Sequence, residues 1–200
     1  MKVITLAAWS RPDYFSKVVN SLENAEGIDE YKILVSLDGG YPQRQTEMVA
    51  ILRESKLDYE VFSHGQNKGC AGNTGFILKK GFERADRVIH FEDDTILHPD
   101  CLRFLEYNLE KYEFLESMSN PIPQGDEFLN HVKLTDKGSW ANPMAHYWRK
   151  GRLEIAPHTS FLQNIGKKEG INTYDMLFHS QIETSMFKPE QRVSDFDTYF

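Results

Sequence analysis

Short apolar runs alternate with amphipathic stretches through the first half of the chain. Four runs rich in β-branched and aromatic residues predict strands, at 3–8, 31–37, 59–62 and 87–91. Between the second and third runs, Met48, Ile51 and Leu52 recur at helical spacing. Strands that alternate with helices predict an α/β fold with a mostly parallel central sheet flanked by helices.

The helix boundaries are predicted from capping and turn residues. Ser10 followed by Asp13 predicts a capping box at the start of the first helix. A glycine-rich loop is expected at 67–75, leading into a helix that ends at Phe82. Another helix is expected after residue 100, whereas 117–137 is polar and contains proline and glycine, which predicts a long loop.

The fourth apolar run ends in three consecutive carboxylates, Glu92, Asp93 and Asp94. Like charges this close repel each other, so a positive partner is expected beside them. Open α/β sheets bind ligands at the carboxyl ends of their strands, and carboxylates there suit a hard cation, Mg²⁺ or Mn²⁺, that keeps positions open for substrate phosphates. The alternative is a solvated acidic turn.

Two other loops follow predicted strands and should reach the same edge of the sheet. Arg11 follows the first strand, and Asp38 and Gly39 follow the second. A nucleotide bound there would have its base or ribose held by Asp38, and its diphosphate by Arg11 and the metal. The stretch 67–73 would permit close backbone approach to that ligand, although it matches neither a Walker A loop nor a G-x-G-x-x-G fingerprint.

Length, charge and cysteine content narrow the class of protein. The chain has 200 residues, which predicts a single domain, and no apolar segment is long enough to cross a bilayer. Its net charge of -7 argues against a nucleic acid partner. Cys70 and Cys101 are expected to be free thiols on separate helices. The polar turn after the first strand argues against a signal peptide, so a cytoplasmic protein is expected.

Taken in order, these motifs resemble the GT-A nucleotide-sugar glycosyltransferases. The likeness is to family 2-like enzymes and to the N-acetylglucosaminyltransferase I group, whose DXD-like metal motif also reads Glu-Asp-Asp. Pro99-Asp100 and the tail from Pro157 to Gly166, which includes Asn164-Ile165-Gly166, are similar to motifs of such enzymes. The resemblance implies one Rossmann-like domain of GT-A type over 1–200, with 1–115 binding the nucleotide-sugar and metal and 116–200 forming the acceptor side.

The resemblance also implies a role for each matching residue. Asp94 would be the direct ligand of Mn²⁺ or Mg²⁺, while Asp93 and Glu92 would hold the donor sugar, the ribose or metal-bound waters. Asp38 would contact uracil or ribose, and Arg11 would line the nucleotide pocket. The other expected substrate-binding residues are Gly39, Asn67, Lys68, Asn73 and Trp140.

The implied activity is metal-dependent transfer of a sugar, with inversion, from a UDP-sugar to a hydroxyl of a glycan or another acceptor. In the similar enzymes an acidic residue follows a tryptophan and acts as the base. Here Trp140 is followed by Ala141 and Asn142, neither of which takes up a proton at neutral pH. Asp136 and Glu154 are the nearest candidates for the catalytic base.

Two other functions are alternatives to this activity. A non-catalytic module that binds sugar nucleotides or glycans would keep the donor pocket and lack the base, as Ala141 and Asn142 allow. A sugar-1-phosphate nucleotidyltransferase would need a glycine-rich first loop with basic residues, and the segment 8–12 has no glycine. Trp140 could stack on a sugar or pack in the core.

Overall fold

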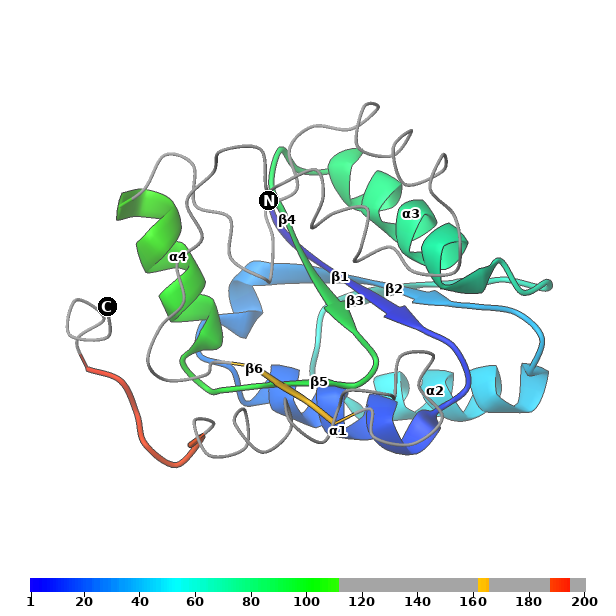
Figure 1. Ribbon diagram of the computed structural model, residues 1–200, viewed down its shortest axis with the longest axis horizontal. Coiled ribbons are helices and arrows are strands. Elements are labelled where there is room, and N and C mark those ends of the chain that lie inside the picture. The colour runs from blue at the N-terminus through cyan, green and yellow to red at the C-terminus, as the bar shows by residue number, and fades with distance from the viewer. Residues whose placement is uncertain (112–161, 166–187, 195–200) are drawn as a thin grey trace, which may run out of the picture.

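The computed structural model describes residues 1–111, 162–165 and 188–194 (Figure 1). Its centre is a parallel sheet with the strand order β3-β2-β1-β4, which confirms the predicted α/β fold class. The strands are β1 (Lys2–Ala8), β2 (Tyr31–Leu37), β3 (Tyr59–Ser63) and β4 (Val88–Glu92). Ala8 pairs with Leu37, and Ala7 pairs with Glu92. The carboxyl ends of β1, β2 and β4 are therefore aligned at one edge.

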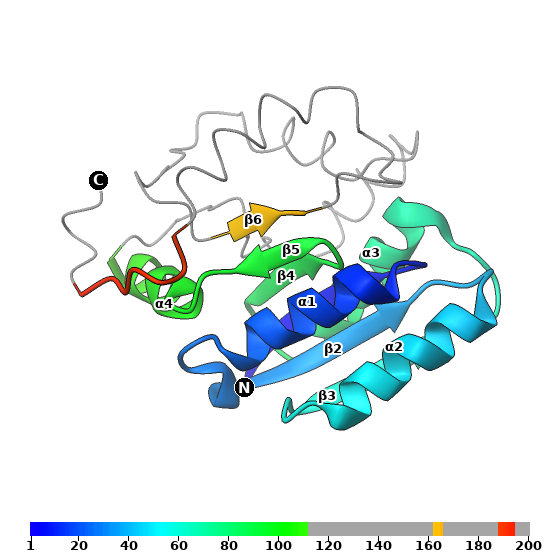
Figure 2. The ribbon, with the colours of Figure 1, turned by 90° about the horizontal axis from the view of Figure 1, so that it is seen from below.

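Helices cover both faces of the sheet. Helices α1 (Pro12–Glu23) and α2 (Pro42–Glu54) lie together on one face, and α3 (Gly69–Phe82) covers the other (Figures 1 and 2). Ile4 and Leu6 of β1 pack toward α1 and α2, whereas Val3 packs toward α3. Burial on both faces explains why these strands read as continuous apolar runs.

Two helix starts differ from the sequence expectation. The predicted capping box is wrong, because Arg11 is the N-cap of α1, makes no side-chain cap hydrogen bond, and is followed by Pro12 in the first turn. Helix α3 begins at Gly69, so most of the predicted glycine-rich loop is helical. Burial of Ala71 and Thr74 against the sheet outweighs the low helix propensity of the glycines.

The chain after β4 forms a smaller layer. Strand β5 (Thr95–Leu97) pairs antiparallel with β6 (Leu162–Asn164), and α4 (Cys101–Lys111) follows β5. A short 3-10 helix, η1 (Ile28–Glu30), precedes β2. Cys70 and Cys101 are free thiols in α3 and α4, as expected.

A distant segment, 188–194, is attached to the turn before α4. Buried His98 lies with its Nε2 3.0 Å from the carbonyl of Lys188 and 3.2 Å from that of Gln191. Asp100, which is also buried, accepts hydrogen bonds from the Arg192 side chain and from the backbone N–H of Val193. His98 and Asp100 therefore anchor this segment.

Several expectations concern residues that the structure does not describe. The long loop at 117–137 lies outside the described residues, and the single domain over 1–200 and its two halves stay predictions. Within the described ranges, none of the helices has the length and apolar character needed to cross a bilayer. The cytoplasmic location also stays a prediction.

Candidate functional site

Asp93 and Asp94 form the turn directly after β4, at the carboxyl edge of the sheet. They are 3% and 7% exposed, so the alternative of a solvated acidic turn is wrong. The Arg11 guanidinium, from the end of the loop after β1, lies between them, with Nη2 donating to Asp93 Oδ1 and lying 3.0 Å from Asp94 Oδ2. The backbone N–H of Trp9 donates to Asp93 Oδ2 at 3.2 Å. The positive partner expected beside the acids is therefore present as Arg11.

Burial and the neighbouring charges shift the pKa values of Asp93 and Arg11. Burial raises the pKa of Asp93, and the neighbouring Arg11 opposes that shift. Burial also acts to lower the pKa of Arg11, but Asp93 and Asp94 outweigh it and raise that pKa. The Nη1 nitrogen of Arg11 is buried and finds no hydrogen-bond acceptor among the described residues. An unsatisfied buried donor is costly, so this nitrogen is suited to an incoming acceptor.

Asp38 follows β2 at the same edge and is 2% exposed. Its Oδ1 accepts the backbone N–H groups of Gly39 at 2.8 Å and Lys68 at 2.7 Å. None of the described residues donates to Oδ2, which leaves that oxygen for a ligand hydroxyl or amide. Gly39 allows the close approach of this loop to the next one, because a Cβ there would lie 2.2 Å from the carbonyl carbon of Gln66.

Asn73 lies beneath these loops on α3 and is buried. Its Nδ2 donates to the carbonyls of Ala8 at 3.2 Å and Ser36 at 3.3 Å, and its Oδ1 accepts the Ser36 hydroxyl at 2.5 Å. These bonds fix the ends of β1 and β2 to the helix. Contact between Asn73 and a substrate stays a prediction.

Asn67 and Lys68 lie at the turn into α3. The Asn67 side chain accepts the N–H of Gly69 at 2.7 Å, and Gly69 has a φ of 74°, which favours glycine. The Lys68 ammonium lies 5.5 Å from the centre of the Phe76 ring. Both side chains are exposed beside Asp38, so they are accessible to a ligand at this edge.

An aromatic pair, Trp9 and Tyr41, was missed by the sequence analysis. Their ring centres are 5.5 Å apart in an edge-to-face arrangement, and the Trp9 indole N–H donates to the carbonyl of Gly39 at 3.1 Å. They are 37% and 49% exposed, which is unusual for large aromatic side chains. Their positions just after β1 and β2 are the signal that could have identified them.

The donor set suits a divalent cation that is completed by a substrate. Two adjacent carboxylates provide the hard oxygen ligands that Mg²⁺ and Mn²⁺ prefer, and the Arg11 guanidinium already holds a positive charge between them. No cluster of three or more metal-ligating side chains occurs in the described part of the chain. A cation held by these two carboxylates would have its other positions open to phosphate oxygens and water.

Strand β6 leads to a residue that contacts the acidic turn. The backbone N–H of Ile165 donates to the carbonyl of Asp94 at 2.7 Å, which places Ile165, just after β6, next to the acidic turn. Glu92 is the last residue of β4 and is partly buried. Burial, and then the charges of Glu92, Asp93 and Asp94, raise the pKa of Cys70 to about 12. The candidate base residues Asp136 and Glu154, and Trp140, lie outside the described residues.

No protein-family model and no curated protein matches this chain. Among solved structures, S. aureus TarS in complex with UDP-GlcNAc matches over 62% of this chain and 37% of its own, with 18% identity and a TM-score of 0.49. The mannosyltransferase PcManGT from Pyrobaculum calidifontis, in complex with GDP-Man and Mn²⁺, matches over 54% of this chain and 32% of its own, with 10% identity and a TM-score of 0.45.

A third solved structure, the galactosyltransferase LgtC with donor and acceptor sugar analogues, matches over 48% of this chain and 38% of its own, with 19% identity and a TM-score of 0.36. The matched part thus spans well under half the length of each of these proteins. Likenesses this distant do not decide an activity, so function is inferred from the side chains at the sheet edge.

Proposed function

We propose that this chain is a GT-A type glycosyltransferase that moves a sugar from a nucleoside diphosphate sugar, a UDP-sugar, to an acceptor hydroxyl with inversion, using Mn²⁺ or Mg²⁺. The observation that supports it is the juxtaposition of buried Asp38 with the Arg11, Asp93 and Asp94 cluster at the aligned ends of β1, β2 and β4. The assignment to the family 2-like and N-acetylglucosaminyltransferase I groups is part of this proposal.

Asp38 is the proposed contact for the nucleoside. Its carboxylate is held rigidly by two backbone N–H groups on one oxygen, which orients the other oxygen for a ribose hydroxyl or a base N–H. The exposed Trp9 ring lies beside the same loop through its bond to Gly39 and offers a flat surface for a base. Asn67 and Lys68, which are exposed next to Asp38, are further proposed contacts.

Arg11, Asp93 and Asp94 are the proposed contacts for the diphosphate and its metal. The Nη1 of Arg11, which has no acceptor in the described part of the chain, would donate to a phosphate oxygen, since a guanidinium matches phosphate geometry. Asp94 would hold the divalent cation, with Asp93 and Glu92 orienting its waters or the donor sugar. When bound, such a cation neutralises charge on the leaving diphosphate.

Proton removal from the acceptor is assigned to Asp136 or Glu154, with Trp140 proposed to contact the acceptor or donor sugar. A carboxylate base opposite the leaving diphosphate would give attack in line and inversion at the sugar carbon. A second candidate function is a binding module without catalysis, which Ala141 and Asn142 favour because they replace the acidic residue expected after Trp140.

The test is release of nucleoside diphosphate from UDP-sugars in the presence of Mn²⁺ and mixed acceptor glycans. Turnover by the wild type that is lost in Asp94→Ala, and kept in Asp86→Ala, supports the transferase. Asp86 is an exposed carboxylate away from the acids. Asp86→Ala changes the net charge of the protein by the same amount as Asp94→Ala, which makes it the matched control. Binding of a UDP-sugar without turnover would instead support the binding module.

A further inference from the structure

Arg11, Asp93 and Asp94 form a compact charge cluster at the carboxyl edge of the sheet. One guanidinium nitrogen, Nη2, contacts both Asp93 and Asp94, and the Arg11 side chain is only 17% exposed. The Arg11 carbonyl accepts the N–H of Phe15 at 2.9 Å, which fixes its backbone at the start of α1. Only the side chain is therefore available to change position.

A divalent cation and this position of Arg11 compete for the same oxygens. A cation bound to a carboxylate oxygen of Asp94 would lie about 2 Å from that oxygen. The Arg11 Nη2 lies 3.0 Å from Asp94 Oδ2. Two positive charges so close together repel strongly in a partly buried site. The bare acidic pair should therefore bind a divalent cation weakly.

A diphosphate removes this competition. Its oxygens offer an acceptor to Arg11 Nη1, for which residues 1–111, 162–165 and 188–194 provide none, and they also provide ligands to the cation. The Tyr14 ring lies 5.3 Å from the Arg11 guanidinium carbon, and its face supports the guanidinium. Both positive groups then have anionic partners.

We infer that Arg11 is a built-in counter-ion of Asp93 and Asp94, which makes binding of a divalent cation depend on a bound diphosphate. The dependence on a diphosphate rests on the proposed function, whereas the competition between Arg11 and the cation does not. Because coupling between two ligands is reciprocal, the cation should strengthen nucleotide binding by the same factor.

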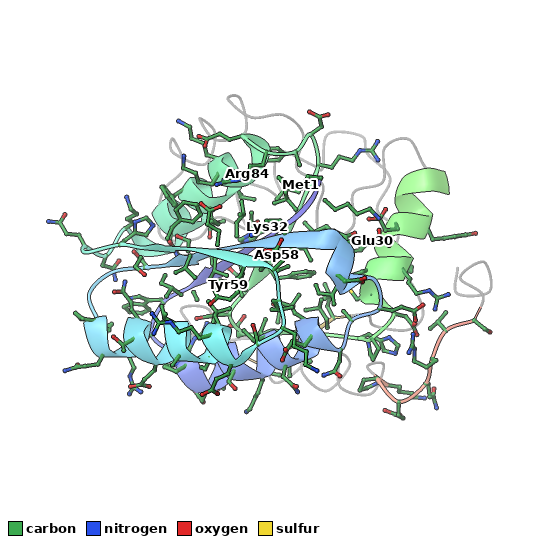
Figure 3. All side chains as sticks on the ribbon, turned by 180° about the vertical axis from the view of Figure 1, so that it is seen from behind. Met1, Glu30, Lys32, Asp58, Tyr59 and Arg84 are labelled. Atoms are coloured by element: carbon green, nitrogen blue, oxygen red, sulfur yellow. The ribbon has the colours of Figure 1, made fainter. Side chains whose placement is uncertain are left out.

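The test compares Mn²⁺ binding, followed by electron paramagnetic resonance of the free ion, in the wild type and three variants, each with and without UDP. Arg11→Gln removes the counter-ion, and Arg11→Lys keeps its charge. Arg84→Gln is the matched control, because Arg84 follows α3, pairs with Glu60 at 2.8 Å, and lies near the amino ends of the strands with Met1 and Lys32 (Figure 3). Arg84→Gln removes the same positive charge as Arg11→Gln, but at a position far from Asp93 and Asp94.

Without UDP, Arg11→Gln is expected to bind Mn²⁺ roughly tenfold or more tightly than the wild type, while Arg11→Lys and Arg84→Gln stay weak. UDP should tighten Mn²⁺ binding in the wild type by roughly tenfold or more and have a smaller effect in Arg11→Gln. A gain in affinity cannot result from misfolding, so Arg11→Gln is informative even if its stability is lower.

Equal or weaker Mn²⁺ binding by Arg11→Gln without UDP would overturn the inference, and so would equally tight binding by Arg11→Lys and Arg11→Gln. If no variant binds UDP with or without Mn²⁺, the proposed function fails. The comparison of Mn²⁺ binding without nucleotide would still decide the role of Arg11.

Discussion

The Asp38 carboxylate accepts a hydrogen bond from the backbone N–H of Lys68 at 2.7 Å. This bond joins the loop after β2 to the start of α3, and the same oxygen accepts the N–H of Gly39. Asp38 therefore shapes the two loops that border the proposed nucleoside pocket, in addition to offering its second oxygen to a ligand.

Replacing Asp38 should reduce both stability and nucleotide binding. Asp38→Ala leaves the N–H groups of Gly39 and Lys68 without their acceptor, and we expect a loss of about 1–3 kcal/mol in the free energy of unfolding. Asp38→Asn keeps one acceptor oxygen and should lose less. Urea denaturation measures the free energy of unfolding of the two variants. An Asp38→Ala protein as stable as the wild type would show that these hydrogen bonds contribute nothing to stability.

Gly39→Ala should disturb the same loops through sterics. The added methyl group would lie 2.2 Å from the Gln66 carbonyl carbon and 2.4 Å from its oxygen, so one of the loops must move. We expect a loss of about 1–3 kcal/mol in stability together with weaker nucleotide binding. Gly65→Ala is the matched control, because a Cβ there meets nothing within 4 Å. Equal effects of the two substitutions on unfolding and binding would contradict the packing argument.

Asp100 should make stability depend on pH. Burial alone would raise the pKa of Asp100, but hydrogen bonds from Arg192 and Val193 outweigh burial and lower it below the ordinary value of 3.8. Because the pKa is lower in the folded state, ionised Asp100 contributes its whole stabilisation at pH values well above 3.8. This contribution is lost as the pH falls toward the folded-state pKa. Asp100→Asn should therefore be less stable by about 2–3 kcal/mol at pH 7, with the difference shrinking in acid.

The control for Asp100 is Asp58→Asn. Asp58 is an exposed partner of Lys32 at the amino edge of the sheet, where both are visible together (Figure 3). A surface pair of this kind contributes about 0–1 kcal/mol. Thermal denaturation between pH 3 and pH 7 gives the comparison, and parallel curves for wild type and Asp100→Asn would refute the linkage.

Cys70 should react slowly with alkylating reagents. With its pKa raised to about 12, first by burial and then by Glu92, Asp93 and Asp94, almost all of this thiol stays protonated at pH 8. Only the thiolate is nucleophilic, so we expect iodoacetamide labelling to be slower by roughly a hundredfold or more than in the urea-unfolded chain. Mass spectrometry separates Cys70 from Cys101. A native rate within a few-fold of the unfolded rate would contradict this environment.

The acidic part of the site was predictable from local sequence. A buried strand followed by carboxylates predicts a ligand site at a sheet edge, and Asp38 and Asp94 follow strands that the structure confirms. Parallel pairing then brings these loops together, because β1 lies between β2 and β4. Their proposed roles toward a ligand stay predictions.

Other features depend on contacts that no local pattern encodes. The direct pairing of Arg11 with Asp93 joins residues 82 positions apart and follows from the register of β1 and β4. The capping-box prediction failed because Pro12 can begin a helix without a side-chain cap. Trp9 and Tyr41 were missed because exposure of an aromatic residue cannot be read from hydrophobicity. The anchoring of 188–194 by Asp100 is likewise a long-range contact.

The most direct test of the central claim is a thermal-shift titration with a panel of nucleoside diphosphates, with and without Mn²⁺. A ligand that binds only the native state raises the melting temperature by mass action. The account predicts that a uridine diphosphate stabilises the wild type and Asp86→Ala, that Mn²⁺ enlarges this shift, and that Asp94→Ala loses the enlargement. No shift with any nucleotide, or an unchanged Mn²⁺ effect in Asp94→Ala, would contradict it.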